Sequence, residues 1–342
     1  MKEVKEKPIL LAHGDGGALT HQLVQDLFLQ HFKHEALQAQ NDGALLKALS
    51  GPPVLSTDSF VISPYFFPGG DIGKLAVAGT VNDIAVTGAI PLYLTVAFIL
   101  EEGLPISDLE KIVASLAKTA EEAGVAIVAG DTKVVERGHG DGIYINTTGL
   151  GYMPAERHLG YHQIQAGDKI IINGTIGDHG LSILSTRAGI AFDTELSSDC
   201  APLNHLIEAI LQSCPGAVKF MRDPTRGGVA TTAKEIALAS EKDLILDEEA
   251  LPIGETVAGA AEFLGLDPLY MANEGKVIII VDGERAEEVL ATMRELPHGH
   301  NSAVIGKVEE KKSHKGQLYV KTHFGSHRIL DMIAGDPLPR IC

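Results

Sequence analysis

The sequence has no cysteine pattern that would serve a disulfide framework or a cysteine zinc site. It contains three cysteines, Cys200, Cys214 and Cys342, which is an odd number without a CxxC pair. A disulfide-stabilised secreted fold is therefore not expected. We expect Cys200 and Cys214 to be ordinary small, buried apolar side chains.

Basic clusters and long apolar runs are also lacking. The chain carries 28 Lys and Arg against 45 Asp and Glu, a formal net charge of -17, and no basic patch that would attract a nucleic-acid backbone. The longest apolar stretch, residues 89–100, is too short to span a bilayer. The charged start, residues 1–7, is unlike a secretory signal. We therefore expect a cytoplasmic protein that binds neither nucleic acid nor membrane.

The length favours two domains, because single hydrophobic cores rarely grow beyond about 250–300 residues. Hydrophobic residues make up 45% and charged residues 21% of the 342 residues, as is typical of globular proteins. Strand and helix patterns alternate in two blocks, separated by a polar stretch at 154–167. We predict an α/β protein with mixed sheets. Its expected parts are an N-terminal domain of residues 1–155, a C-terminal domain of residues 156–310, and strands with a flexible tail at 311–342.

Apolar periodicity gives the expected elements. A helix over 107–123 is predicted to begin with a capping box made by Ser107 and Glu110. Further helices are expected at 20–32, 74–87, 180–188, 203–212, 228–239, 253–264 and 285–296. Strands are expected at 54–62, 92–99, 125–129, 142–151, 169–173, 277–281, 303–308, 317–322 and 327–333.

Four aspartates lie at unusual positions. Asp58 interrupts an apolar strand, and Asp83 lies on a helix whose neighbours are nearly all small or apolar. Asp71 and Asp131 lie next to glycine, where a turn or helix-cap role is the simpler explanation. Converging carboxylates repel by about 4 kcal/mol for a pair about 4 Å apart, so cations would have to lie between them. An oxygen-only ligand set suits Mg²⁺ bound with a nucleotide.

Three glycine-rich segments, at 13–17, 69–73 and 223–228, precede predicted helices. Main-chain N–H groups at such positions are suited to anions. No GxxxxGK[ST] or GxGxxG motif is present, which excludes a P-loop and a Rossmann site. The residues alone therefore predict a magnesium–nucleotide enzyme and leave its reaction open.

Six segments together resemble the HypE family, hydrogenase maturation proteins of the aminoimidazole ribonucleotide synthetase (PurM-like) superfamily. Five of them, at 57–61, 68–74, 79–85, 129–133 and 223–228, are shared across the superfamily. The ending Pro339-Arg340-Ile341-Cys342 selects HypE. The resemblance runs from Leu10 to Cys342. It implies a two-domain PurM-like fold that binds ATP between its domains and forms a homodimer through strands of the N-terminal domain.

The resemblance also implies an activity, that of an ATP-dependent carbamoyl dehydratase. HypF would place a carbamoyl group on Cys342, and the enzyme would dehydrate this S-carboxamide to an S-cyanide. The HypC–HypD complex would then receive the cyanide as a ligand for the iron of [NiFe]-hydrogenase. Attack of the amide oxygen on the γ-phosphate turns a poor leaving group into phosphate, and this step needs charge neutralisation more than a protein nucleophile.

Site residues follow from the same resemblance. The implied catalytic residues are Cys342, Glu274 and Lys133, with Glu274 or Lys133 as the proton-abstracting base. The simpler explanations are a turn residue for Glu274 and a solvated or phosphate-binding side chain for Lys133. The implied metal ligands are Asp58, Asp71, Asp83 and Asp131. The nucleotide is expected to contact these four aspartates and also Gly16, Gly17, Lys74, Asn82, Thr132, Asp223 and Arg226.

The tail would bring the reactant to the ATP. Seven residues follow Gly335, and with Pro337 and Pro339 among them they extend to about 22 Å at about 3.1 Å per residue. Such an arm reaches from a partner into an interdomain cleft. Two alternatives stay open. One is a superfamily cyclo-ligase or phosphotransferase acting on a free small molecule, which would have no use for Cys342. The other is a non-catalytic, ATP-responsive carrier that holds iron or a partner through its terminal thiol.

Overall fold

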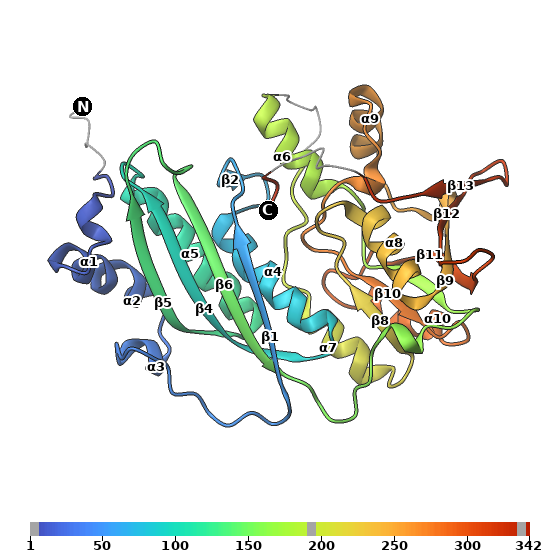
Figure 1. Ribbon diagram of the computed structural model, residues 1–342, viewed down its shortest axis with the longest axis horizontal. Coiled ribbons are helices and arrows are strands. Elements are labelled where there is room, and N and C mark those ends of the chain that lie inside the picture. The colour runs from blue at the N-terminus through green and yellow to red at the C-terminus, as the bar shows by residue number, and fades with distance from the viewer. Residues whose placement is uncertain (1–6, 190–195, 334–339) are drawn as a thin grey trace.

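The computed structural model describes residues 7–189, 196–333 and 340–342. Its two halves each contain one large sheet with helices against it, and they lie side by side (Figure 1). The predicted two-domain α/β architecture is thereby confirmed. Pro337 and Pro339, which were expected to stiffen the tail, lie outside the described residues.

The N-terminal half is built on a four-stranded sheet in the order β1-β6-β4-β5. Its strands are β1 (Pro53–Phe60), β4 (Ile90–Glu101), β5 (Ala126–Val135) and β6 (Ile143–Tyr152). Only β4 and β5 are parallel.

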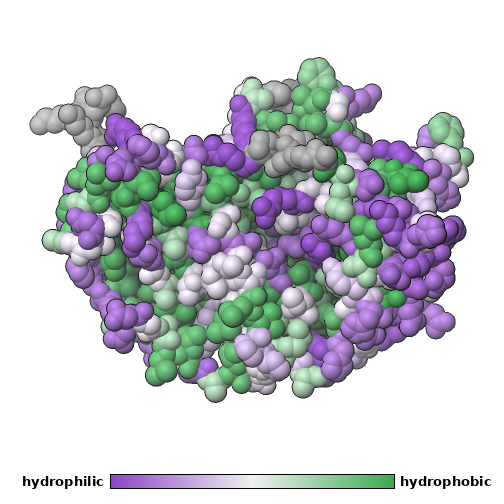
Figure 2. Space-filling view, in the orientation of Figure 1, coloured by the Kyte–Doolittle hydropathy of each residue, from purple (hydrophilic) through white to green (hydrophobic). Residues whose placement is uncertain are grey.

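Two helices, α4 (Ile72–Val86) and α5 (Ile106–Ala123), cover one face of this sheet (Figure 1). Side chains alternate along β1, so Ser56 and Asp58 face α4 while Leu55 faces the other way. The opposite face carries Leu55, which is 67% exposed, and Ile99, which is 43% exposed. Apolar patches are visible there in the space-filling view (Figure 2).

The C-terminal half has a seven-stranded sheet in the order β13-β12-β9-β11-β7-β10-β8. Alternate isoleucines of β7 are buried on opposite faces, which explains why its sequence is a continuous apolar run. The strands are β7 (Lys169–Ile172), β8 (Val218–Arg222), β9 (Lys242–Asp247), β10 (Ile278–Val281), β11 (Ala303–Glu310), β12 (Leu318–Lys321) and β13 (His327–Leu330).

Helices pack on both faces of this sheet. The core on one face includes residues of α8 (Gly228–Ser240), and the core on the other includes residues of α7 (Asn204–Ser213) and α10 (Ala286–Arg294). The other α-helices described in this half are α6 (Asp178–Ala188) and α9 (Glu255–Leu264), and the N-terminal half also contains the short α3 (Glu35–Gln38). None of the helices in the described ranges is both long and apolar enough to cross a membrane.

Several elements differ from the sequence-based prediction. The capping box is wrong, because α5 begins at Ile106 with Pro105 as its N-cap and no side-chain cap. The helix expected at 20–32 is divided into α1 (Ala18–Leu23), a π-helical stretch η2 (Val24–Phe28) and α2 (Leu29–His31). Strands β8 and β9 were not predicted.

Candidate functional site

Strand β1 and helix α4 bring Asp58 and Asp83 together. Ser56 donates its hydroxyl to Asp83 Oδ2 at 2.7 Å, and Thr80 donates to Asp58 Oδ2 at 3.4 Å. Thr80 and Asp83 are three residues apart on α4 and so share a helix face. Burial and the nearby charge of Asp83 raise the pKa of Asp58 to about 7. The two carboxylates therefore repel each other when both are ionised.

A third carboxylate comes from the C-terminal half. Asp223 follows β8, and burial together with the charge of Asp83 raises its pKa to about 7. Asp58, Asp83, Asp223 and Arg226 line one cavity of 720 Å³ between the two halves. Arg226 favours the ionised form of Asp58. This interdomain cavity, which we call the acidic cleft, therefore contains four of the predicted site residues.

Glu274 lies beside the acidic cleft in the loop before β10. Its side chain is 3% exposed, and its Oε1 has no hydrogen-bond partner among the described residues. Burial, then the charges of Asp223 and Asp199, raise the pKa of Glu274 well above its usual value. An unpartnered buried carboxyl oxygen is rare and points to an interaction that forms only with substrate.

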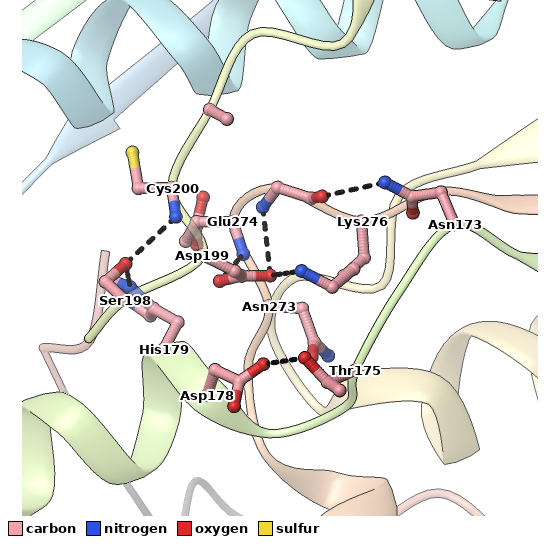
Figure 3. A network of polar contacts seen from close by, with 12 residues as sticks. Asn173, Thr175, Asp178, His179, Ser198, Asp199, Cys200, Asn273, Glu274 and Lys276 are labelled. Atoms are coloured by element: carbon pink, nitrogen blue, oxygen red, sulfur yellow. Dashed lines mark hydrogen bonds and ion pairs between the residues drawn. The ribbon is translucent and has the colours of Figure 1, made fainter. Parts of the chain in front are cut away.

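Asp199 shapes the loop that carries Glu274. Its carboxylate accepts hydrogen bonds from Glu274 N at 3.1 Å, Gly275 N at 3.2 Å and Lys276 Nζ at 2.9 Å (Figure 3). Burial opposes its ionisation, but the charge of Lys276 and these hydrogen bonds bring its pKa below the usual value. Asp199 is therefore the ionised partner that fixes the position of Glu274.

The C-terminal residues are docked against the end of β1. Val61 N donates to the main-chain oxygen of Cys342 at 3.2 Å, and Ser63 N donates to Arg340 O at 3.4 Å. Ile341 is buried, and Cys342 packs against the N-terminal core. Val61 lies three residues beyond Asp58, about 10 Å along an extended chain. The docked C-terminus therefore lies against the continuation of the strand that carries Asp58, and Cys342 is not among the residues that line the acidic cleft.

Three predicted site residues have structural roles instead. Asp71 is the N-cap of α4, where it accepts hydrogen bonds from Gly73 N at 2.7 Å and Lys74 N at 3.1 Å, and burial raises its pKa. Lys74 Nζ donates to Gly69 O at 2.9 Å. Asn82 is buried, and its amide joins the two halves through Ala201 O at 3.0 Å and Leu203 N at 2.7 Å. Asp71 does not line the acidic cleft, and its convergence with the other aspartates stays a prediction.

Another group of predicted residues lies at the opposite edge of the sheet. Gly16, Asp131, Thr132 and Lys133 line a separate cavity of 210 Å³, whose other lining residues are mostly apolar. Lys133 Nζ pairs with Asp131 Oδ1 at 2.8 Å, and this hydrogen bond lowers the pKa of Asp131. We call this cavity the β5 pocket. Asp131 is thus separated from Asp58 by the width of the sheet, because β5 and β1 are its two edge strands.

In the glycine loop at 13–17, two main-chain N–H groups already donate hydrogen bonds to nearby side chains. Gly16 N donates to Thr20 Oγ1 at 3.0 Å, and Gly17 N donates to Asp15 Oδ1 at 2.7 Å. Phosphate contacts by these two N–H groups would require both hydrogen bonds to break. Within the described ranges, no three His, Cys, Asp or Glu side chains lie close enough to hold a metal ion.

Sequence reasoning missed His179, Ser198, Asp199 and Lys276, which connect the tail and Glu274 (Figure 3). The only local signal was the pair of glycines that flank Asp178 and His179. Their role depends on contacts between residues that are far apart in the sequence.

Comparisons with known proteins agree with the two-domain structure. The chain matches two family models of AIR synthase related proteins, the N-terminal domain over residues 40–153 and the C-terminal domain over 165–319. It is 48% identical over 340 residues to the carbamoyl dehydratase HypE of Azotobacter vinelandii, covering 99% of each chain. A crystal structure of the hydrogenase maturation protein HypE in complex with ATP matches with a TM-score of 0.93 and 50% identity, covering 97% of this chain and 99% of that one. A HypE–HypF complex matches with a TM-score of 0.79 and 47% identity, covering 93% of this chain and 100% of that one.

Proposed function

Since this chain belongs to the AIR synthase related proteins and, within them, to the HypE carbamoyl dehydratases, we propose that its own Cys342 carries the group on which it acts. The chain is an ATP-dependent carbamoyl dehydratase of hydrogenase maturation. The docking of Cys342 beside Val61, on the continuation of the strand that carries Asp58, is the observation that supports this proposal most strongly.

The reaction has two stages, phosphorylation of the amide oxygen and loss of phosphate. The oxygen of the S-carboxamide on Cys342 attacks the γ-phosphorus of ATP, ADP leaves, and one N–H proton is lost. Cleavage of the C–O bond then releases phosphate, and loss of the second N–H proton gives the S-cyanide. The net change on the enzyme is the loss of one water, which ends up in the phosphate and ADP.

Glu274 is our candidate for the base that takes these protons. Its unpartnered Oε1 is available, and its raised pKa makes the ionised form a better proton acceptor than an ordinary carboxylate. Ala272, two residues earlier, packs in the same core as Ile341 and Cys342. We assign Lys133 to the phosphates, because it lies at the β5 pocket away from the docked tail.

Magnesium is proposed for the acidic cleft. The raised pKa values of Asp58 and Asp223 are the effect expected of carboxylates that lack a neutralising cation. One or two carboxylates with waters and phosphate oxygens are a donor set that suits Mg²⁺. The cation would neutralise phosphate charge, and the neighbouring Asp58 and Asp83 would hold it.

A homodimer would bring the residues of the β5 pocket next to those of the acidic cleft. In the described part of the chain, neither β1 nor β5 has a second neighbouring strand, and the face with Leu55 and Ile99 is open. Pairing the β5 edge of one copy with the β1 edge of another would bring Lys133 and Asp131 to the partner copy's acidic cleft. The apolar β5 pocket would then receive the nucleobase, with the triphosphate passing Lys133.

Mixing two inactive variants tests this arrangement. Lys133→Ala and Asp58→Asn subunits, after exchange, should recover about a quarter of the wild-type rate, because half the dimers would contain one intact site. Two Asp58→Asn preparations mixed in the same way are the control. A mixture that stays as inactive as the separate variants would contradict a shared site.

The proposed partners are HypF, with which a HypE relative has been crystallised, and a HypC–HypD acceptor of the cyanide. Cytoplasmic location stays a prediction. The identity to a carbamoyl dehydratase disfavours a cyclo-ligase acting on a free molecule.

Intact mass spectrometry tests the function directly. After incubation with HypF, its carbamoyl donor and ATP, the wild-type chain should gain a carbamoyl group and then lose one water. Cys342→Ala should bind ATP normally and show neither change. A Cys342→Ala chain that still acquires cyanide on Cys200 or Cys214 would contradict the proposal, and ATP-independent tail binding without mass change would favour a carrier.

A further inference from the structure

A histidine that the dehydration chemistry does not use reaches the residue next to Cys342. His179 lies near the start of α6, is completely buried, and its Nε2 is 2.8 Å from Ile341 O. Its other ring nitrogen, Nδ1, is 2.7 Å from Ser198 Oγ. Phe67 packs edge-on against the ring, with centroids 5.6 Å apart.

These contacts determine the tautomer of His179. Ile341 O can only accept, so Nε2 must carry the proton. Cys200 N donates to Ser198 Oγ at 3.0 Å, which leaves the Ser198 hydroxyl proton free to go to Nδ1. Burial lowers the pKa of His179, which agrees with a neutral ring. Ser198 therefore holds His179 in the form that donates to the tail (Figure 3).

The tail is held from both halves of the molecule. From the N-terminal half, Val61 N binds the Cys342 oxygen, and Asp141 pairs with the Arg340 guanidinium at 2.8 Å. From the C-terminal half, His179 binds Ile341 O, and the Arg187 guanidinium donates to Arg340 O. Of Val61, Asp141, His179 and Arg187, His179 is the buried residue, so its hydrogen bond to Ile341 O is shielded from water.

We infer that His179 is a positioning residue that holds the C-terminal segment in its docked place, with Ser198 fixing the tautomer that does so. The inference rests on the proposed function only for its catalytic consequence. Docking holds the terminal residues against both halves of the molecule for dehydration, whereas loading by a partner needs the thiol released. Weakening the contact should therefore slow dehydration without slowing loading.

The first test measures the tail without any catalysis. Cys200 and Cys214 are 2% and 1% exposed, so a thiol reagent such as DTNB should report on Cys342 in the folded protein. His179→Phe keeps an aromatic ring at this position but leaves Ile341 O without its hydrogen-bond donor. An unsatisfied buried carbonyl disfavours the docked tail, so the Cys342 thiol should react about tenfold faster than in the wild type. His179→Gln offers an amide N–H to the same carbonyl and should restore most of the protection.

Two further variants complete this test. Ser185→Ala changes a buried hydroxyl of the same helix that donates to Ser182 O, and its Cys342 thiol should react at the wild-type rate. Ser198→Ala should increase the rate of thiol reaction by a smaller factor, since the neutral ring of His179 can then adopt either tautomer. This variant replaces His179→Phe in the test if His179→Phe does not fold. Equal thiol reactivity in wild type, His179→Phe and Ser198→Ala would overturn the inference.

The second test separates positioning from a general loss of structure. In single-turnover reactions followed by intact mass, His179→Phe should load carbamoyl at the wild-type rate or faster but dehydrate it about tenfold more slowly. Loading and dehydration slowed together would indicate a merely structural role and overturn the inference. Absence of dehydration in the wild-type chain would instead refute the proposed function, and the thiol result would still decide the role of His179.

Discussion

Magnesium should stabilise the protein at about pH 8 far more than at about pH 5. The pKa of Asp58 and of Asp223 is about 7 in the folded chain, against 3.8 for an ordinary aspartate. A folded-state pKa above the unfolded one means that the native state binds the proton more tightly. Its contribution to stability is complete below about pH 4 and is lost as the pH rises through about 7. A cation between the ionised carboxylates would replace the lost protons.

The size of the effect follows from the same pKa values. A shift of about three units is worth about 4 kcal/mol for a fully shielded group. Asp58 and Asp223 line an open cavity, so solvent screening reduces the contribution to about 1–2 kcal/mol each. Unfolding entropy for a chain of this length is about 0.7 kcal/mol per degree. Saturating Mg²⁺ should therefore raise Tm by about 3–5 °C at pH 8 and by less than about 1 °C at pH 5.

Thermal melts followed by circular dichroism, with Mg²⁺ or with EDTA at each pH, measure this difference. Asp58→Asn should lose about half of the shift, because its amide does not titrate whereas Asp223 still does. Asp247→Asn is the matched control, since Asp247 pairs with Lys321 and lines neither the acidic cleft nor the β5 pocket. Equal Mg²⁺ shifts at both pH values, or an unchanged shift in Asp58→Asn, would refute the reasoning.

The other predictions concern single residues. Asp83→Asn should reduce magnesium-dependent ATP hydrolysis, measured by phosphate release, by about a hundredfold. The reason is that Asp83 is the charged neighbour of both Asp58 and Asp223. Unchanged turnover would show that Asp83 is not part of the site. Glu274→Gln should keep the wild-type Tm but lower dehydration by about a hundredfold in single turnovers, and an active variant would exclude Glu274 as the base. Gly228→Ala should destabilise by about 2–4 kcal/mol in urea unfolding, since φ is +63° and a Cβ would lie 2.5 Å from Leu269 O. Gly254→Ala, where nothing lies within 4 Å, should change stability little, and equal effects of the two would contradict this account.

The part of the site that could be predicted is local in the sequence. Asp58 was recognised because a carboxylate interrupts an apolar strand, and Asp83 because it lies on an apolar helix. Periodicity assigned β1 and α4, and side-chain alternation then brought these two residues to one face. Asp71 shows the limit of such reasoning, because an aspartate beside glycine at a helix start is an N-cap as readily as a ligand.

The rest of the site depends on topology. Asp131 lies within β5, which extends beyond the predicted strand end, and nothing local in the sequence indicates that β5 is at the far edge of the sheet from β1. Strand β9 was missed for a related reason. Its buried Asp243 accepts hydrogen bonds from Lys312 N at 3.0 Å and Gln317 N at 2.9 Å, both more than 60 residues further along the chain. Partners so far away in the sequence cannot be read from periodicity.

A tail that carries the reactant must be held and also released, and the docked contacts have the strength that this requires. Burying the side chain of Ile341 contributes about 2 kcal/mol. The hydrogen bonds from Val61, Ser63 and His179 contribute about 1 kcal/mol each. Ordering three residues costs about 1–2 kcal/mol apiece, so the two sums nearly cancel. The further contacts of Arg340 with Asp141 and Arg187 then favour the docked tail by about 1–2 kcal/mol, and removing one bond, such as that of His179, is enough to change which state predominates.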